Sequence, residues 1–156
     1  YYAVLDHSDH AVLPMIIADS LYTKETTYEY EQTFSLEAYI DWMKWDAVFD
    51  PSYEVLEIKQ QDDVVIAKIS KIDKRLTFLH EGPTVSSETL KFDGPKIKSI
   101  ERMDVVFNDS IFVKNRTDLL AWIDQNHPEL NGFIFDQTKQ GGLNYLKALE
   151  LFQKNN

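Results

Sequence analysis

The segment after Phe34 carries apolar side chains at a helical spacing, and the segments beyond it alternate apolar and polar side chains. Ser35 is placed to cap a helix that ends near Phe49, and Phe34 and Tyr39 form a hydrophobic staple around that cap. The apolar face comprises Leu36, Tyr39, Ile40, Met43 and Ala47 and is widened by Trp42, Trp45, Val48 and Phe49. Because so little of this helix is polar, we expect a sheet to cover it.

The runs after this helix predict that sheet. Strands are expected over 53–60, 64–70, 84–92 and 96–101, with tight turns at Asp62-Asp63 and Asp93-Gly94. An earlier run over 21–31 suits an edge strand or a small hairpin. No crossover helix is predicted between consecutive strands, so the fold class is α+β with an antiparallel sheet and helices gathered on one face.

Helical patterns also occupy both ends of the chain. Asp9 is placed to cap a short helix running to Ala18, the second of two antiparallel helices at the start. Near the other end, Thr117 would cap a helix over 118–125, and Thr138 would cap a final helix that runs to about Gln153. The buried face of the final helix is expected to be Leu143, Leu146, Leu149 and Phe152.

Composition narrows the class of protein. The chain has 156 residues, 44% of them hydrophobic, and no apolar run approaches the roughly 20 residues that span a bilayer. Its 16 basic and 26 acidic residues leave a net charge of −10, which would repel a phosphate backbone, so nucleic acid is not an expected partner. The absence of cysteine fits a reducing cytosol and a periplasm equally well, so the compartment stays open.

The order of these pieces resembles the nuclear transport factor 2-like superfamily, which includes ketosteroid isomerases, scytalone dehydratases and polyketide-cyclase-like proteins. The resemblance covers about Tyr1 to Arg102. It rests on Tyr1-Tyr2-Ala3-Val4-Leu5, the Asp9 turn, Ile17-Ala18-Asp19, the helix from Phe34 to Phe49, and the strands that end in Leu90-Lys91-Phe92-Asp93-Gly94-Pro95-Lys96-Ile97.

This resemblance implies a strongly bent sheet wrapped around N-terminal helices to form a cone with a ligand-sized cavity. Residues 1–104 would form this cone domain. Residues 105–156 depart from the family pattern and would form a C-terminal helical extension. We expect the extension to pack on the same domain, because Leu119, Leu120, Trp122, Leu146 and Leu149 have no other core to join.

The ketosteroid-isomerase branch also implies a set of catalytic roles. It uses a tyrosine on the first helix, an acidic base at the end of the first strand and a hydrogen-bonding carboxyl on a later strand. Those roles would fall on Tyr2, Glu25 and Glu88, although both acids in that branch are aspartates. Within the strand, Glu88 shares one face with Leu90 and Phe92, and that face is expected to point inward. Residues expected to line the cavity are Tyr39, Trp42, Trp45, Leu90 and Phe92.

Structural interpretations of the same residues are simpler. Tyr2 would cover the sheet, Glu25 would be solvated, and Glu88 would pair with a lysine on a neighbouring strand. The aromatic surplus would then serve core and dimer packing. His7, Asp9 and His10, together with Asp6, fit a solvated turn better than a metal site, and no cofactor-binding motif is found, so neither a metal nor a cofactor is expected.

Two hypotheses of different classes follow. The first is a cone that binds a small apolar or aromatic ligand without catalysis, or that serves only as a dimerising module. The alternative is a proton-transfer enzyme of the isomerase, dehydratase or cyclase type that acts on an enolisable substrate. Two carboxyls in the cavity, with a tyrosine in hydrogen-bond reach, would favour the enzyme. A homodimer through the outer face of the sheet is expected in either case.

Overall fold

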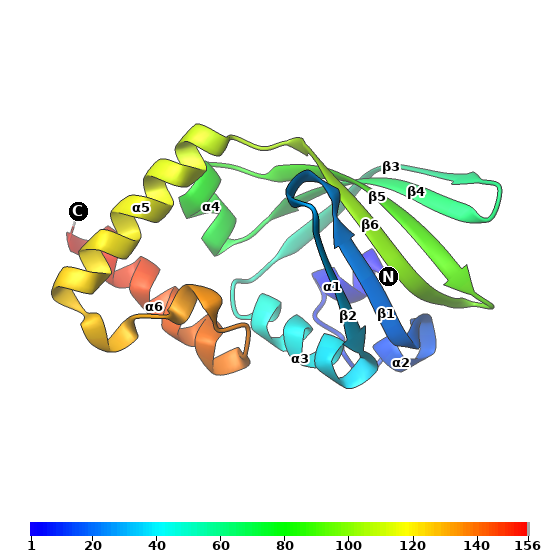
Figure 1. Cartoon of the computed structure of the whole chain (residues 1–156), viewed down its shortest axis with the longest axis horizontal. Coiled ribbons are helices and arrows are strands. Elements are labelled where there is room, and N and C mark those ends of the chain that lie inside the picture. Colours follow the sequence, from blue (N-terminus) through cyan, green and yellow to red (C-terminus); the bar gives the residue numbers. More distant parts are fainter. Residues whose placement is uncertain (156) are drawn as a thin grey trace.

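Six strands form one curled, unclosed sheet in the computed structural model, which describes residues 1–155 (Figure 1). The spatial order is β2-β1-β6-β5-β4-β3. The strands are β1 (Ile17–Glu25), β2 (Tyr30–Ser35), β3 (Ser52–Gln61), β4 (Val64–Ile72), β5 (Thr84–Asp93) and β6 (Lys96–Val106). The helices are α1 (Tyr2–Asp6), α2 (Leu13–Ile16), α3 (Leu36–Ala47), α4 (Lys74–His80), α5 (Asp109–Asn126) and α6 (Lys139–Asn155), with single 3-10 turns at Thr26–Tyr28, Pro128–Leu130 and Phe133–Phe135.

Helix α3 begins where the sequence predicts. The Ser35 hydroxyl accepts a hydrogen bond from the Ala38 amide at 3.1 Å, which satisfies one of the free amides of the first turn. The rings of Phe34 and Tyr39 meet edge to face, with centroids 5.5 Å apart, as expected for a staple. A sheet covers α3 as predicted, so the α+β class is confirmed.

The sheet is mixed, whereas the sequence analysis expected it to be antiparallel. Strand β1 pairs antiparallel with β2 but parallel with β6, which is the last strand along the chain. Parallel neighbours need a long connection, and the chain from β2 through β5 supplies one. Local alternation of side chains reveals strands but not this long-range pairing, which explains the wrong prediction.

Three helices differ from their predicted extents. Helix α4 was not predicted; it begins after Asp73, whose carboxylate accepts from the Leu76 amide at 2.6 Å. Helix α5 begins at Asp109 with Asn108 as its cap, so Thr117 lies inside the helix and does not cap it. At the start of the chain, α2 covers only Leu13–Ile16, because the following residues extend into β1.

The final helix starts as predicted but buries a different face. The Thr138 hydroxyl accepts from the Gly141 amide at 3.1 Å and caps α6. Leu143, expected in the core, is 44% exposed, while Leu149 is buried as predicted. The buried face is Gly141, Gly142, Tyr145, Ala148 and Leu149. Gly142 lies directly against Trp45 and Val48 at the end of α3, and Gly141 lies against Asp136, so the first turn of α6 is packed on its glycine side and Leu143 lies on the exposed side.

Helix α3 separates two clusters of buried side chains. Its Tyr39 and Met43 pack with α1, α2 and the inner face of the sheet. Its Trp45, together with Phe49 just beyond it, packs with α4, α5 and α6. Figure 1 shows these three helices gathered at one end of the sheet, away from the tip of the β3–β4 hairpin. The C-terminal segment therefore shares a core with α3.

Candidate functional site

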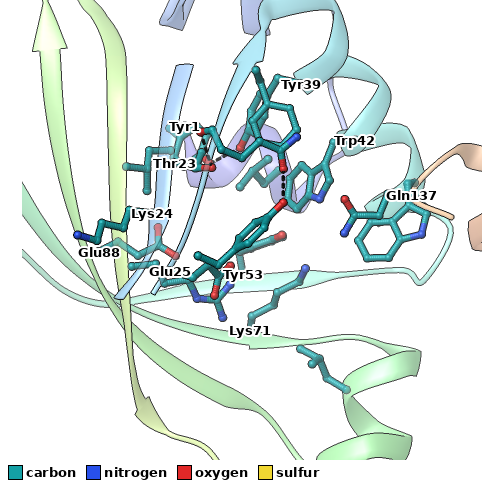
Figure 2. Close-up of a pocket in the computed structure, with 18 of the residues that line it drawn as sticks. Tyr1, Thr23, Lys24, Glu25, Tyr39, Trp42, Tyr53, Lys71, Glu88 and Gln137 are labelled. Carbon is teal, nitrogen blue, oxygen red and sulfur yellow. Dashed lines mark hydrogen bonds between the residues drawn. The ribbon is translucent and has the colours of Figure 1, made fainter. Parts of the chain in front are cut away.

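A pocket of about 230 Å³ opens between the inner face of the sheet and helix α3 (Figure 2). One wall is aromatic: the rings of Tyr39 and Trp42 stack with centroids 5.3 Å apart, and Trp45 continues the wall. The opposite wall is made by strand residues, among them Glu25, Glu88 and Arg102. An apolar wall facing a few charged groups is the usual construction of a small-molecule site.

Strand register brings these three charged residues side by side. Arg102 on β6 pairs with Glu88 on β5 and, on its other side, with Glu25 on β1. Residues paired across a sheet project from the same face, so the three side chains point together into the pocket. We call Glu25, Arg102 and Glu88 the acidic row.

A single bulge creates this alignment. Phe92 pairs with Ile97, but Lys91 pairs with Ser99, so Lys98 is an extra residue in β6. Without that residue, the register of the hairpin would put Glu101 opposite Glu88 and turn Arg102 to the outer face. The bulge therefore decides which charge stands between the two carboxylates.

Glu88 is nearly buried and is held by two donors. The Tyr2 hydroxyl donates to its Oε2 at 2.7 Å, and the Ser86 hydroxyl donates to its Oε1 at 3.2 Å. A carboxylate offers about four acceptor positions, so Glu88 keeps capacity for a ligand. Tyr2 is buried and is not among the described residues that line the pocket. Burial and the nearby Glu88 carboxylate raise the pKa of Tyr2, which keeps its hydroxyl protonated as a donor.

Arg102 carries the positive charge of the row. Burial by itself lowers the pKa of Arg102, but the carboxylates of Glu25, Glu88 and Asp104 outweigh burial and raise it, so the guanidinium is charged. Its Nε lies 3.7 Å from Asp104 Oδ1 and has no hydrogen-bond partner within residues 1–155. The row thus has a net charge of −1 and an unused donor beside two acceptors.

The expected lining residues are divided between the pocket and the core. Tyr39, Trp42 and Trp45 line the pocket. Leu90 is buried and Phe92 half-buried, and both pack in the core formed with α1 and α2. Glu88, Leu90 and Phe92 do share the inward face of β5, with Leu90 and Phe92 farther along the strand from the pocket.

A pair of tyrosine hydroxyls lies in the pocket, and the sequence analysis did not predict this pair. Tyr1 and Tyr39 place their hydroxyl oxygens 2.5 Å apart, and both residues line the pocket. Only one of the two can donate to the other, so one O–H stays free for a ligand, since neither has a further hydrogen-bond partner within residues 1–155. The family resemblance implied a catalytic role for Tyr2, and in the structure the Tyr2 hydroxyl donates to Glu88.

A buried group of charges, also missed, flanks the pocket at the start of α4. Lys71 Nζ lies 2.5 Å from Asp46 Oδ1 and 3.6 Å from Asp73, and Arg75 contacts Asp73 at 3.3 Å. We call Asp46, Lys71, Asp73 and Arg75 the ion cluster. Period-two alternation puts Lys71 on the inward face that Ala67 and Ile69 share, and that was the available signal.

Interactions among its members keep the ion cluster ionised. Burial works against the ionised form of Asp46, but Lys71, Arg75 and two hydrogen bonds outweigh it and hold its pKa below the usual value. One of those bonds comes from the Tyr53 hydroxyl, which donates to Asp46 Oδ2 at 2.7 Å. Burial lowers the pKa of Lys71 in spite of its two carboxylate neighbours. The cluster has two charges of each sign and is neutral as a whole.

The residues at the first turn and the lengths of the helices bear on metals and membranes. Within residues 1–155 there is no group of three or more His, Asp or Glu side chains placed to hold a metal ion. His7 in the first turn lies 3.5 Å from Asp6, whose other oxygen accepts from the Tyr53 amide. Over the same residues no helix has the length and apolar character needed to cross a membrane.

Comparisons with known proteins identify the fold. No family model and no curated protein sequence matches the chain. Among solved structures, a nuclear transport factor 2-like protein of unknown function from Cytophaga hutchinsonii aligns with a TM-score of 0.50 and 10% identity, over 67% of this chain and 82% of that one. The chain has the nuclear transport factor 2-like fold.

Two other structures with this architecture have more specific descriptions. A SnoaL-like polyketide cyclase from Agrobacterium tumefaciens aligns with a TM-score of 0.55 and 15% identity, over 74% of this chain and 91% of that one. A proposed ketosteroid isomerase from Kribbella flavida aligns with a TM-score of 0.56 and 8% identity, over 70% and 75%. Identities this low establish the fold, and the fold hosts several functions.

Proposed function

We propose that this chain binds a small, largely aromatic molecule in the pocket, with a hydroxyl or amine of the ligand donating to Glu88. The observation that carries this proposal is the acidic row facing an aromatic wall across one cavity. The wall offers a stacking surface, and Glu88 retains acceptor positions after Tyr2 and Ser86 have donated to it.

The charges around the pocket balance, which favours a neutral ligand. The ion cluster contributes no net charge, because Asp46 and Asp73 balance Lys71 and Arg75. At the sheet wall, Lys24 also lines the pocket and offsets the net negative charge of the acidic row. A charged ligand of either sign would have to be desolvated without a net opposite charge to bind, which costs free energy.

Calorimetric titration with 2-naphthol tests this proposal. The probe has two fused rings to stack on Trp42 and one hydroxyl to donate to Glu88. We expect Glu88→Gln to weaken binding about tenfold, because the hydrogen bond to a charged acceptor is lost while the shape is kept. Glu54→Gln, on an exposed position of β3, is the matched control and should bind as the unaltered protein does. Equal affinity in both variants would contradict the proposal.

A specific observation favours a second function, proton transfer on an enolisable substrate. Two carboxyls, Glu25 and Glu88, reach one pocket from both sides of Arg102, and the Tyr1–Tyr39 pair holds a free O–H there. A carboxylate would take a proton from the carbon next to a carbonyl, and the O–H would hydrogen-bond the enolate oxygen. The solved neighbours described as an isomerase and a cyclase agree with this class of chemistry.

Deuterium exchange separates the enzyme from the plain binder. The probe is 2-tetralone, an aromatic ketone whose enol resembles 2-naphthol, followed by proton NMR in D₂O. An enzyme should accelerate the exchange of protons on the carbon next to the carbonyl. Glu25→Gln and Glu88→Gln should each lower the exchange rate at least tenfold. A rate equal to that of buffer, together with binding of 2-naphthol, would leave the binding function alone.

We further propose that two copies associate through the outer face of the sheet. Apolar side chains are exposed there or near its rim, among them Ile72, Met103 and Val105. Exposed apolar patches on a sheet often mark an interface. Sedimentation equilibrium at micromolar concentration should give a dimer, and Met103→Glu should shift it toward monomer. A monomer in the unaltered protein would overturn this proposal.

A further inference from the structure

One pocket residue comes from the C-terminal helical segment. Gln137 lines the pocket, whereas the other described residues that line it all precede position 103. Gln137 also borders an outer hollow between α3 and the start of α6, where it is joined by Thr138, Lys139 and Gln140. Because Gln137 belongs to both spaces, it stands where the pocket meets the outer hollow.

The backbone on both sides of Gln137 is fixed. Asp136 Oδ1 accepts from the Thr138 amide at 3.0 Å, and these hydrogen bonds hold the pKa of Asp136 below its usual value. The Thr138 carbonyl accepts from the Gly142 amide at 2.9 Å, in addition to the hydroxyl cap on Gly141. A side chain that starts from such a turn has a defined direction.

Close packing ties this turn to the aromatic wall. A methyl group at position 141 would lie 2.1 Å from the Asp136 carbonyl oxygen, and one at position 142 would lie 3.1 Å from the Trp45 ring. At position 141 only glycine allows this approach without displacing the turn, and at position 142 a methyl group would require the Trp45 ring to shift by a few tenths of an ångström. The turn that carries Gln137 therefore rests directly against a residue of the pocket wall.

The carboxamide of Gln137 is available to a ligand. It has no hydrogen-bond partner within residues 1–155, and in Figure 2 it points toward the pocket beside Trp42, on the side opposite Glu88. A carboxamide both donates and accepts, so it can recognise a hydroxyl, a carbonyl or an amide.

We propose that Gln137 is a specificity-determining residue, which hydrogen-bonds a second polar substituent at the end of the ligand remote from Glu88. The ligand class is then an elongated aromatic molecule with polar groups at both ends. This inference rests on the proposed binding function and deepens it. It also gives the C-terminal segment a part in recognition in addition to its packing.

Matched pairs of probes test the inference by calorimetry. The pairs are 2-naphthol with naphthalene-2,6-diol, and the longer 4-phenylphenol with biphenyl-4,4′-diol. The unaltered protein should bind one diol about three- to tenfold more tightly than its mono-hydroxy partner. In Gln137→Leu the two members of each pair should bind with equal affinity, so that the advantage of the diol vanishes. Gln140→Leu, in the outer hollow only, is the control and should keep the advantage.

The outcomes separate this inference from the proposed function. Mono-hydroxy binding without any diol advantage, or an advantage that survives Gln137→Leu, would overturn the role of Gln137 and leave the binding function standing. Binding of none of the four probes would overturn both. As an independent measurement, the side-chain amide signals of Gln137 in nitrogen-15-labelled protein should shift with the diol and stay in place with its mono-hydroxy partner.

Discussion

The acidic row and the ion cluster use the same kinds of side chain on one sheet, yet they are built for different tasks. In the ion cluster each charge faces an opposite charge, Lys71 and Asp46 are almost completely buried, and the total charge is zero. In the acidic row two carboxylates flank Arg102, whose side chain is 29% exposed. The Nε atoms of Arg102 and of Arg75 both lack a hydrogen-bond partner within residues 1–155, so the two regions differ in burial and net charge. A buried, balanced cluster indicates a structural role, and an excess of carboxylates beside a pocket indicates a binding role.

The largest effect should come from breaking the ion cluster. Lys71→Met removes one charge and leaves Asp46 buried beside a methionine, which should lower the free energy of unfolding by about 3–5 kcal/mol. Urea denaturation followed by tryptophan fluorescence measures it. Lys74→Met is the control, because the exposed Lys74–Asp50 pair, at 3.8 Å, should contribute at most about 1 kcal/mol. Similar losses in both variants would contradict the structural role of the cluster.

Substitutions on α6 test our proposal that residues 105–156 belong to the same folding unit as the rest of the chain. Leu149 is buried against α3 and α5, so Leu149→Ala should cost about 2–5 kcal/mol. Leu143→Ala on the same helix should cost less than about 1 kcal/mol, because that side chain is largely exposed. A single cooperative transition is expected for both variants. A separate early transition in Leu149→Ala would mean that the C-terminal helices unfold on their own.

A substitution in the acidic row should change ligand affinity more than it changes the free energy of unfolding. Arg102→Met should cost less unfolding free energy than Lys71→Met, because the Arg102 side chain is 29% exposed and that of Lys71 is 8% exposed. It also changes the charge of the row from −1 to −2, so the cation 2-naphthylmethylammonium should bind about tenfold more tightly at low salt. Lys68→Met, on the outer face of β4, should leave that affinity unchanged. An unchanged affinity in Arg102→Met would show that the row does not face the ligand.

The smallest expected effect concerns His80, which lies in neither region. Burial lowers the pKa of His80, aided by Arg75, and its ring stacks on Phe112 with centroids 5.1 Å apart. The unfolded chain takes up a proton near pH 6.5 while the folded chain does so only at lower pH, so stability should fall as the pH drops below about 6.5. His80→Phe should reduce this loss between pH 7 and 5, and the exposed His10→Phe should not. Parallel pH profiles for all three proteins would exclude His80 as the source.

Local sequence determined the elements and several of their ends. Ser35 and Thr138 cap helices as predicted, and Asp62 and Gly94 adopt the left-handed backbone that tight turns need. Alternation alone put Glu88 and Leu90 on one inward face. These features depend on neighbours within a few residues, so the sequence by itself carries them.

Tertiary structure decided which of these residues meet. The parallel pairing of β1 with β6 brings Glu25 to Arg102, and the bulge at Lys98 brings Arg102 to Glu88. Neither is visible in a side-chain pattern, because a register shift of one residue reverses a strand's faces without changing its composition. The same holds for Gln137, which reaches the pocket from a turn that packs closely through Gly141 on Asp136 and through Gly142 on the end of α3. Contacts between distant segments are set by packing of the whole chain, and the pocket consists almost entirely of such contacts.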